Sequence, residues 1–380
     1  MSNVAIASCR SYDRTEVEKA VAKCLHELGG IGNFISAGER VLVKPNLLAA
    51  DPPEKGTDTH PEVVRAVLLE VLQIGANPIV GDSPGFGSLS RVAEKAGIAQ
   101  VCRELGVPLA GFNEDVEVKT CPEGKVLKSF PLVKEITEVD AIINVSRVKT
   151  HGLTRLTGAV KNLFGCVAGL HKGEMHFRLQ RADVFQGMLI DLALTLKPTL
   201  TIVDGVTAME GAGPRNGSLR HLGLILAGEN PFSVDAVIAR LVGLHFQEVP
   251  LLALAVQRGI TGIRDSEIEI RGEELENFII QDFKVPTSST RIDLKVPEWV
   301  IRLFRRYVSP YPVIHDNCKR CLVCLQACPA KVITLSAGKV RIKDEECIRC
   351  YCCQELCPHD AIELKVPLLG RLFLKSSLIL

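Results

Sequence analysis

Eight of the fourteen cysteines lie in two runs near the C-terminus, and each run has the spacing C-x2-C-x2-C-x3-C-P. The first run comprises Cys318, Cys321, Cys324, Cys328 and Pro329, and the second comprises Cys347, Cys350, Cys353, Cys357 and Pro358. This spacing is typical of bacterial [4Fe–4S] sites, in which three thiolates surround one cluster and the fourth cysteine reaches the other. The sequence therefore predicts a protein that carries electrons.

The two runs predict two [4Fe–4S] clusters with crossed ligands. Cys318, Cys321, Cys324 and Cys357 would hold one cluster, and Cys347, Cys350, Cys353 and Cys328 the other. The second run repeats the first 29 residues later, as expected of a duplicated structural unit. In this repeat Cys352 falls opposite Val323, so we expect Cys352 to pack beside the ligands. Zinc or disulfides are the alternatives, but zinc usually takes C-x2-C pairs separated by a longer gap.

A second group of polar residues follows apolar segments that we predict to be strands. These residues are Lys44 and Asn46 after 40–43, Asp82 and Ser83 after 77–80, Lys149 and His151 after 139–145, and Asp204 after 199–203. Lys161 and Asn162 lie in 155–164, where apolar residues recur at helical spacing. Ligands bind outside the carboxyl ends of the strands in an open parallel sheet, so these side chains are expected to share one site.

Lys44, Lys149, His151 and Lys161 would suit a small anion such as a carboxylate or a phosphate. We assign catalytic roles to His151, as an acid or base, and to Lys149 and Lys161. Substrate binding is assigned to Lys44, Asn46, Asp82, Ser83, Asn162 and Asp204. The segment 169–176 is predicted to be a loop, in which His171, Glu174 and His176 are a weaker alternative as metal ligands.

The elements around these residues alternate between strand and helix from Val4 to about Gly272. Apolar strands at 4–9, 40–48, 139–145, 199–204 and 222–227 alternate with helices such as 14–28, 60–75 and 231–242. The pattern predicts an α/β fold, in which helices flank a mainly parallel sheet, followed by a small α+β ferredoxin-like domain. We expect an α/β body over 1–288, a linker helix over 289–310, a two-cluster ferredoxin-type domain over 311–368 and an apolar tail over 369–380.

Composition excludes several classes of partner. The 380 residues carry a net charge of +1, so nothing favours nucleic acid. The N-terminus lacks the pattern of a signal peptide, and no uncharged apolar run approaches the length of a membrane span. Six scattered cysteines remain outside the ligand set, as in a reducing compartment. We therefore expect a cytoplasmic protein without a membrane span, although the basic helix at 299–308 and the apolar tail leave membrane-surface contact open.

The body resembles the domain-of-unknown-function family 362. The similarity lies in Val41–Asn46, Asn144–His151, Gly158–Gly165 and Ile202–Gly205. Members of that family often carry a C-terminal two-cluster ferredoxin module, and the cysteine runs here are similar to such a module. The resemblance implies one body domain with an iron–sulfur module, and it supports Lys44, Asn46, Lys149, His151, Lys161 and Asn162 as site residues. It implies no substrate.

Three functions are compatible with this pattern. The first is an iron–sulfur oxidoreductase that exchanges electrons with a redox partner protein or ferredoxin and acts on a small anionic substrate. The second is an electron-transfer module that docks a partner without turning over a substrate. The third is an isomerase or lyase whose clusters are structural. Neither a radical-SAM cysteine loop nor a dinucleotide fingerprint is present.

Overall fold

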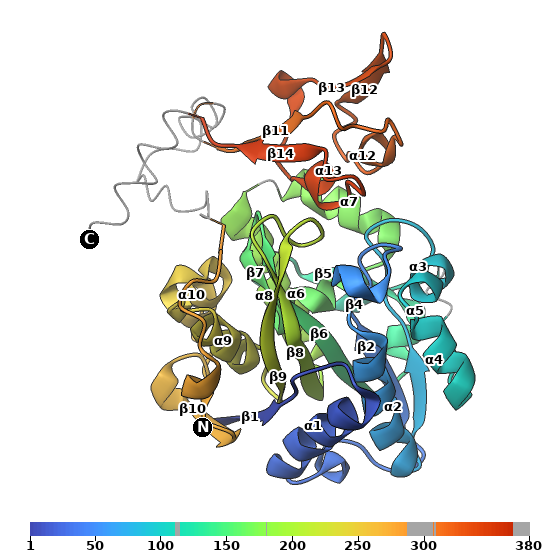
Figure 1. Ribbon diagram of the computed structural model, residues 1–380, viewed down its shortest axis with the longest axis vertical. Helices are drawn as coiled ribbons and strands as arrows, with labels where there is room; N and C mark the ends of the chain where they lie inside the picture. Colours follow the sequence, from blue (N-terminus) through green and yellow to red (C-terminus); the bar gives the residue numbers. More distant parts are fainter. Residues whose placement is uncertain (111–114, 180, 287–306, 308, 368–380) are drawn as a thin grey trace.

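The computed structural model describes residues 1–110, 115–179, 181–286, 307 and 309–367. The body is built on an eight-stranded sheet (Figure 1). Its strand order is β10 (Ile268–Gly272), β1 (Ser2–Ser8), β9 (Ser218–Gly228), β8 (Leu200–Glu210), β6 (Ala141–His151), β2 (Arg40–Pro45) and β3 (Asn77–Val80), with β7 (Arg155–Thr157) beside β6. β9 is antiparallel to both its neighbours, whereas β8, β6, β2 and β3 run parallel. The predicted α/β fold with a mainly parallel sheet is confirmed.

Helices cover both faces of this sheet, and a separate apolar core lies on each side. One core contains α1 (Arg14–Glu27), α2 (Pro61–Gln73), α3 (Leu89–Lys95) and α4 (Ile98–Leu105). The other contains α8 (Ala182–Leu196), α9 (Pro231–Leu241) and α10 (Pro250–Gln257). A hairpin of β4 (Val116–Thr120) and β5 (Ser129–Val133), followed by α5 (Lys134–Thr137), lies outside the main sheet. Burial on both faces explains why the central strands are almost continuously apolar.

Two local predictions were wrong. The segment predicted as a loop at 169–176 belongs to an α-helix, α7 (Gly169–Arg178), which packs Met175 into the core despite the low helix propensity of its two glycines. The segment predicted as one helix at 155–164 is instead β7 followed by the short α6 (Ala159–Asn162) and a 3-10 turn. In both places tertiary packing overrides the local pattern.

The C-terminal part reproduces the 29-residue sequence repeat in its backbone. The helix α12 (Val323–Gln326) recurs as α13 (Cys352–Glu355), and β12 (Ile333–Ser336) recurs as β14 (Ile362–Lys365). Leu322 and Tyr351, which precede the two helices, have matching left-handed φ angles of 63° and 65°. β12 pairs with β13 (Lys339–Ile342), and β14 pairs with β11 (Tyr311–Ile314). The predicted linker helix at 289–310 lies almost entirely outside the described residues, as does the tail at 369–380.

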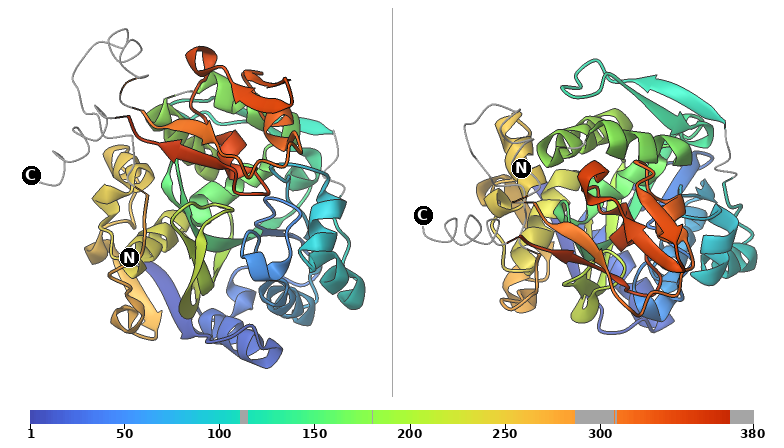
Figure 2. Two further views of the ribbon diagram at one scale, coloured as in Figure 1. Left: turned by 45° about the horizontal axis from the view of Figure 1, so that its top comes forward. Right: turned by 90° about the horizontal axis from the view of Figure 1, so that it is seen from above.

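This C-terminal part sits over one edge of the body sheet (Figures 1 and 2). The helix α13 lies nearest the body, while the β12–β13 hairpin lies at the far end of the molecule. The loop that follows β8 binds the C-terminal end of α13. Arg215 pairs with Asp51 at 2.7 Å and donates to the carbonyl oxygen of Leu356, and Asn216 donates to the carbonyl oxygen of Cys357. The edge beneath α13 is the one where the parallel strands β2, β3 and β6 end.

Candidate functional site

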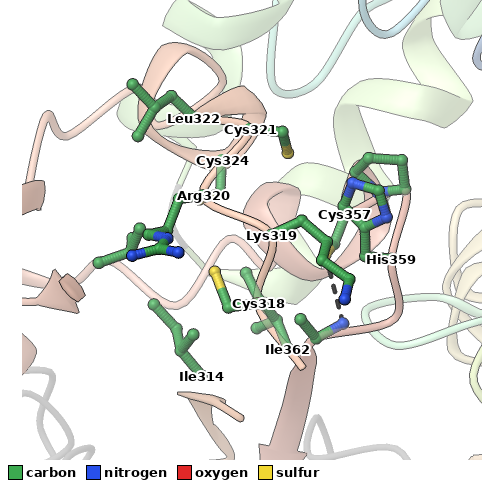
Figure 3. Close-up of a pocket in the computed structure, with 13 residues that line it drawn as sticks. Ile314, Cys318, Lys319, Arg320, Cys321, Leu322, Cys324, Cys357, His359 and Ile362 are labelled. Carbon is green, nitrogen blue, oxygen red and sulfur yellow. Dashed lines mark hydrogen bonds between the residues drawn. The ribbon is translucent and has the colours of Figure 1, made fainter. Parts of the chain in front are cut away.

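The eight cysteines of the two runs line two small cavities in the C-terminal part. One cavity is lined by Cys318, Cys321, Cys324 and Cys357 (Figure 3), and the other by Cys328, Cys347, Cys350 and Cys353. This grouping coincides with the crossed sets that the spacing predicts. The remaining walls are mainly apolar, from residues such as Ile314, Val340 and Ile333.

The donor set of each cavity fits an iron–sulfur cluster. Four thiols surround a void, and in the described part of the chain no three His, Cys, Asp or Glu side chains converge on a position for a single metal ion. In a [4Fe–4S] cubane each thiol binds a different iron atom, so the four sulfur atoms must lie apart rather than converge on one position. The apolar walls raise the pKa of Cys324 to about 11 through burial, so the metal must displace a proton to bind there. Cys352 lines neither cavity.

A third cavity, of about 330 Å³, lies between the body and the C-terminal part. Its floor comes from the ends of β2, β3 and β6 together with α6 and α7, and its roof comes from α12, α13 and the loop between them. The polar residues on its floor are Asn46, Asp82, Ser83, Lys149, Thr157, Lys161, Asn162, Lys172 and His176. The structure therefore brings six of the nine non-cysteine residues proposed from the sequence to one cavity.

Three lysines line this floor, together with the carboxylate of Asp82. Lys149 donates to the side-chain oxygen of Asn46 at 3.1 Å and to the carbonyl of Thr57 at 2.6 Å. Lys172 donates to the carbonyl oxygens of Ser83 and Pro84. Lys161 has no hydrogen-bond or ion-pair partner among the residues that the structure describes. Its ammonium group is therefore the one most available to a bound anion.

Burial lowers the pKa of all three amino groups. For Lys149 the nearby carboxyl of Asp58 opposes this effect, and for Lys161 the carboxyl of Glu355 does. For Lys172 burial lowers the pKa to about 8, despite the opposing charge of Asp82. A bound anion would stabilise the protonated form of each lysine.

Asp235, on α9, holds α6 and therefore Lys161 in place. Its carboxylate accepts hydrogen bonds from the backbone N–H groups of Ala159, at 2.6 Å, and Val160, at 3.1 Å. Burial raises the pKa of Asp235 to about 7, although these two hydrogen bonds oppose the shift. Gly158 leaves room for the carboxylate, because a Cβ there would lie 2.2 Å from it.

Three of the proposed site residues do not line the cavity. Lys44 lies beneath it and pairs with Asp82 at 2.9 Å. His151 lies behind Glu355, with its Nε2 atom 3.0 Å from a carboxylate oxygen of that residue. Asp204 is buried beside Arg147, at 3.3 Å, and accepts a hydrogen bond from the hydroxyl of Tyr12.

His151 acts on the cavity through Glu355. Its Nδ1 atom accepts hydrogen bonds from the backbone N–H groups of Leu153 and Thr154, so the neutral ring carries its proton on Nε2, facing the carboxylate. Burial lowers the pKa of His151, which favours this neutral form. For Glu355 burial would raise the pKa, but His151 and neighbouring cations lower it to about 2. The roof of the cavity thus holds a carboxylate opposite the three lysines.

The roof places the cavity next to predicted cluster ligands. Ala327 and Pro329 flank Cys328, and Cys352 precedes Cys353; all three of these neighbours line the cavity. Leu356, which precedes Cys357, is the remaining neighbour of a predicted ligand in the lining. The cysteine site formed by Cys328, Cys347, Cys350 and Cys353 is therefore the one that adjoins the cavity most extensively.

Sequence reasoning missed Lys172, Cys352 and Glu355 as lining residues. Lys172 was overlooked because 169–176 was predicted to be a loop, and Cys352 was interpreted as packing beside the ligands. Glu355 carried no signal, since its role depends on contact with a distant part of the chain. The alternative metal site is not assembled: His171 is 3.3 Å from Glu174, whereas His176 stacks on Phe185.

An α/β body bearing a cysteine-lined domain of this topology defines an iron–sulfur protein of ferredoxin-domain type. The model of a 4Fe-4S dicluster domain matches residues 312–358, and that of the domain of unknown function DUF362 matches residues 41–240. The chain is 32% identical over 308 residues to a thylakoid-associated protein from Synechocystis sp., an alignment that covers 81% of this chain and 95% of that protein. The chain belongs to the DUF362 family, and its C-terminal domain binds [4Fe–4S].

Two solved structures are similar to part of this chain. The lactate racemase apoprotein from Thermoanaerobacterium thermosaccharolyticum has a TM-score of 0.38 and 13% identity, covering 58% of this chain and 54% of that one. A protein from Thermotoga maritima has a TM-score of 0.33 and 12% identity, covering 57% and 56%. The chain thus spans little more than half the length of these two structures. Within the described residues, no helix combines the length and apolarity needed to cross a bilayer.

Proposed function

We propose that this protein exchanges electrons between two [4Fe–4S] clusters and a small anionic ligand held in the cavity beneath them. The observation that carries the proposal is that three lysines and the neighbours of proposed cluster ligands line the same cavity. Lys149, Lys161 and Lys172 line the same cavity as Pro329 and Cys352, whose neighbours Cys328 and Cys353 are proposed ligands. When bound, such clusters supply single electrons at potentials set by their surroundings.

The side chains around the cavity have distinct roles in this proposal. Lys161 binds the anion directly, and Lys149 and Lys172 add positive charge from either side. Asn46 and Asn162 provide amide groups that orient the ligand. His151 is a positioning residue, since it acts through Glu355, and Lys44 orients Asp82 in the same way.

The roof and the dimensions of the cavity limit the class of ligand. Leu48, Phe86, Pro214 and Leu356 line part of the wall, so one end of the ligand meets apolar surface while the other meets lysines. A volume of about 330 Å³ lies at the lower end of the range for small-molecule sites, roughly 300–1,000 Å³. An organic carboxylate of modest size fits these limits better than a nucleotide.

The proposal also includes the domain limits and the cellular compartment. The body ends near 288, a linker follows over 289–310, and the cluster domain occupies 311–368. The protein works in the cytoplasm, where a reducing environment keeps Cys9, Cys24, Cys102, Cys121 and Cys166 as the buried free thiols seen in the fold. Because the relative is named as thylakoid-associated, cell fractionation should test whether this protein also attaches to a membrane surface.

The ligand can be identified from protein purified without oxygen. Native mass spectrometry of the wild type should show two clusters and a co-purified organic anion. Lys161→Ala should retain its iron and lose the anion, because a charge-assisted hydrogen bond contributes roughly 1.5–3 kcal/mol, or about tenfold or more in affinity. Lys119→Ala, on the exposed strand β4, is the matched control and should keep both. An anion retained equally by all three proteins would refute the lysine site.

A further inference from the structure

The cluster domain carries a strongly basic segment that the cavity does not use. From Cys318 to Lys343 the sequence has six basic residues and no acidic one, in a chain whose net charge is only +1. The six are Lys319, Arg320, Lys331, Lys339, Arg341 and Lys343, and all are exposed. Lys343 pairs with Glu346, at 3.6 Å; within the described residues, the other five form no ion pair with a carboxylate. Their charge is therefore directed to solvent.

Three of these residues lie at or beside the hairpin that is furthest from the body. Lys339 and Arg341 lie on β13 of that hairpin, separated by the buried Val340 (Figure 1). Arg320 reaches the same hairpin, where it donates to the carbonyl of Gly338 at 3.4 Å. Leu335, on the partner strand β12, is 48% exposed. The result is a basic face with an exposed apolar residue beside it.

One predicted cluster ligand reaches the surface within this face. Cys321 is exposed and directly follows Lys319 and Arg320, whereas Cys324 and Cys357 of the same cavity are buried. Lys319 and Arg320 also line that cavity (Figure 3), as does Val340 of β13. The other cysteine site adjoins the interdomain cavity instead. The two cysteine sites therefore differ in position, one opening toward the basic face and the other toward the anion cavity.

We propose that the face formed by Lys319, Arg320, Lys339 and Arg341 docks an acidic one-electron carrier protein next to Cys321. Opposite charge steers such a partner and orients it at the face. Transfer there oxidises the carrier by one electron and reduces the chain by one, with no bond or proton moved. The exposed thiol of Cys321 favours a redox protein over an anionic membrane as the partner. Lipid binding would require positive charge, but it would not require a cluster ligand at the surface. The proposal rests on the proposed clusters and not on the ligand of the cavity.

The test measures binding to the anaerobically reconstituted full chain. The probe is an acidic plant-type [2Fe–2S] ferredoxin, titrated at roughly 0.02 M and 0.2 M salt, with a basic cytochrome c as the counter-probe. We expect ferredoxin binding that weakens at least about tenfold with salt, and weakens by about tenfold or more in Lys339→Glu/Arg341→Glu. Iron content should stay unchanged, since neither residue is a predicted ligand. Cytochrome c should not bind the wild type.

A control variant carries the same charge change on the body. Lys19→Glu/Lys95→Glu replaces two exposed lysines of α1 and α3 and should bind ferredoxin as the wild type does. Equal binding by both double variants, or no effect of salt, would overturn the proposal. Absence of ferredoxin binding would also overturn the proposal. If phosphatidylserine vesicles then bound the wild type but not Lys339→Glu/Arg341→Glu, the face would be identified as a membrane-binding surface. Loss of the cavity anion in Lys161→Ala is a separate result, so the two proposals fail independently.

Discussion

At the scale of single residues, two adjacent cysteines line different cavities. Cys352 and Cys353 are adjacent on α13, yet Cys353 lines a cluster cavity while Cys352 lines the cavity below. Helical geometry separates consecutive side chains by about a quarter of a turn, so adjacent residues face different spaces. The i, i+3 and i+4 relations that bring side chains together do not apply to this pair.

Replacing these two cysteines separately tests the ligand assignment. Cys352→Ala should retain about eight irons, four for each cubane, whereas Cys353→Ala should lose about half of them. Iron analysis and EPR of the reduced proteins measure the difference. Loss of iron from the Cys352 variant, with full iron in the Cys353 variant, would show that the neighbouring thiol is the ligand.

The lysines predict how anion binding depends on pH. A lysine binds an anion as an ammonium group, which is present below its pKa and lost above it. Because burial lowers the pKa of Lys172 to about 8, anion affinity should fall as the pH rises through about 8. An ordinary lysine, with a pKa of about 10.4, would give no change in that range. The measurement is the dissociation constant of the co-purified anion from about pH 7 to 9.

The control for this prediction is Lys172→Met. The variant should bind the anion more weakly than the wild type near pH 7 and should show a flatter pH profile. A profile in the wild type that is flat across the whole range would contradict a site made of buried lysines.

At the scale of elements, the cavity exists because the loop after β8 holds α13. The guanidinium of Arg215 binds both carboxylate oxygens of Asp51, at 2.7 and 2.9 Å, and also the carbonyl of Leu356. Burial alone would raise the pKa of Asp51, but the pair with Arg215 lowers it below its usual value. Both side chains are more than nine-tenths buried. Without Arg215, Asp51 would keep only its longer ion pair with Lys55, at 3.4 Å.

Arg215→Met should loosen the cluster domain from the body without removing its iron. Breaking a buried ion pair costs about 3–5 kcal/mol. The expected results are faster proteolysis between the domains and weaker anion binding. Arg220→Ala is the control on the neighbouring strand: its pair with Asp282 is exposed, so the change should be about 1 kcal/mol or less. Equal proteolysis of the two variants would show that Arg215 does not hold the domains together.

The sequence predicted elements well where one local pattern determined them. The cysteine spacing was enough to anticipate the two cavities, and apolar runs were enough for β2, β3, β6 and β8. It failed at α7, because Gly169 and Gly173 resemble loop residues and the helix is stabilised by packing that involves distant segments. Lys172 was missed for the same reason. Contacts such as His151 with Glu355 join residues about 200 positions apart, and no local pattern encodes them.

At the scale of the whole molecule, the features form a path from one end to the other. The basic face at the hairpin adjoins one cysteine site, the second cysteine site adjoins the cavity, and the cavity lies over the strand ends of the body. In the proposed function, the body binds the ligand while the small domain covers it. This arrangement favours an oxidoreductase over a relay module without turnover, because a relay would need no polar cavity beside its inner cluster.

The most direct test is a single-turnover experiment under anaerobic conditions. The co-purified anion, or its oxidised or reduced form, is mixed with protein of the opposite redox state, and the visible absorption of the clusters is followed. The account predicts a rapid absorbance change in the wild type and one at least about tenfold slower in Lys161→Ala at equal iron content. Equal rates in the two proteins, or no absorbance change with any redox form of the anion, would contradict it.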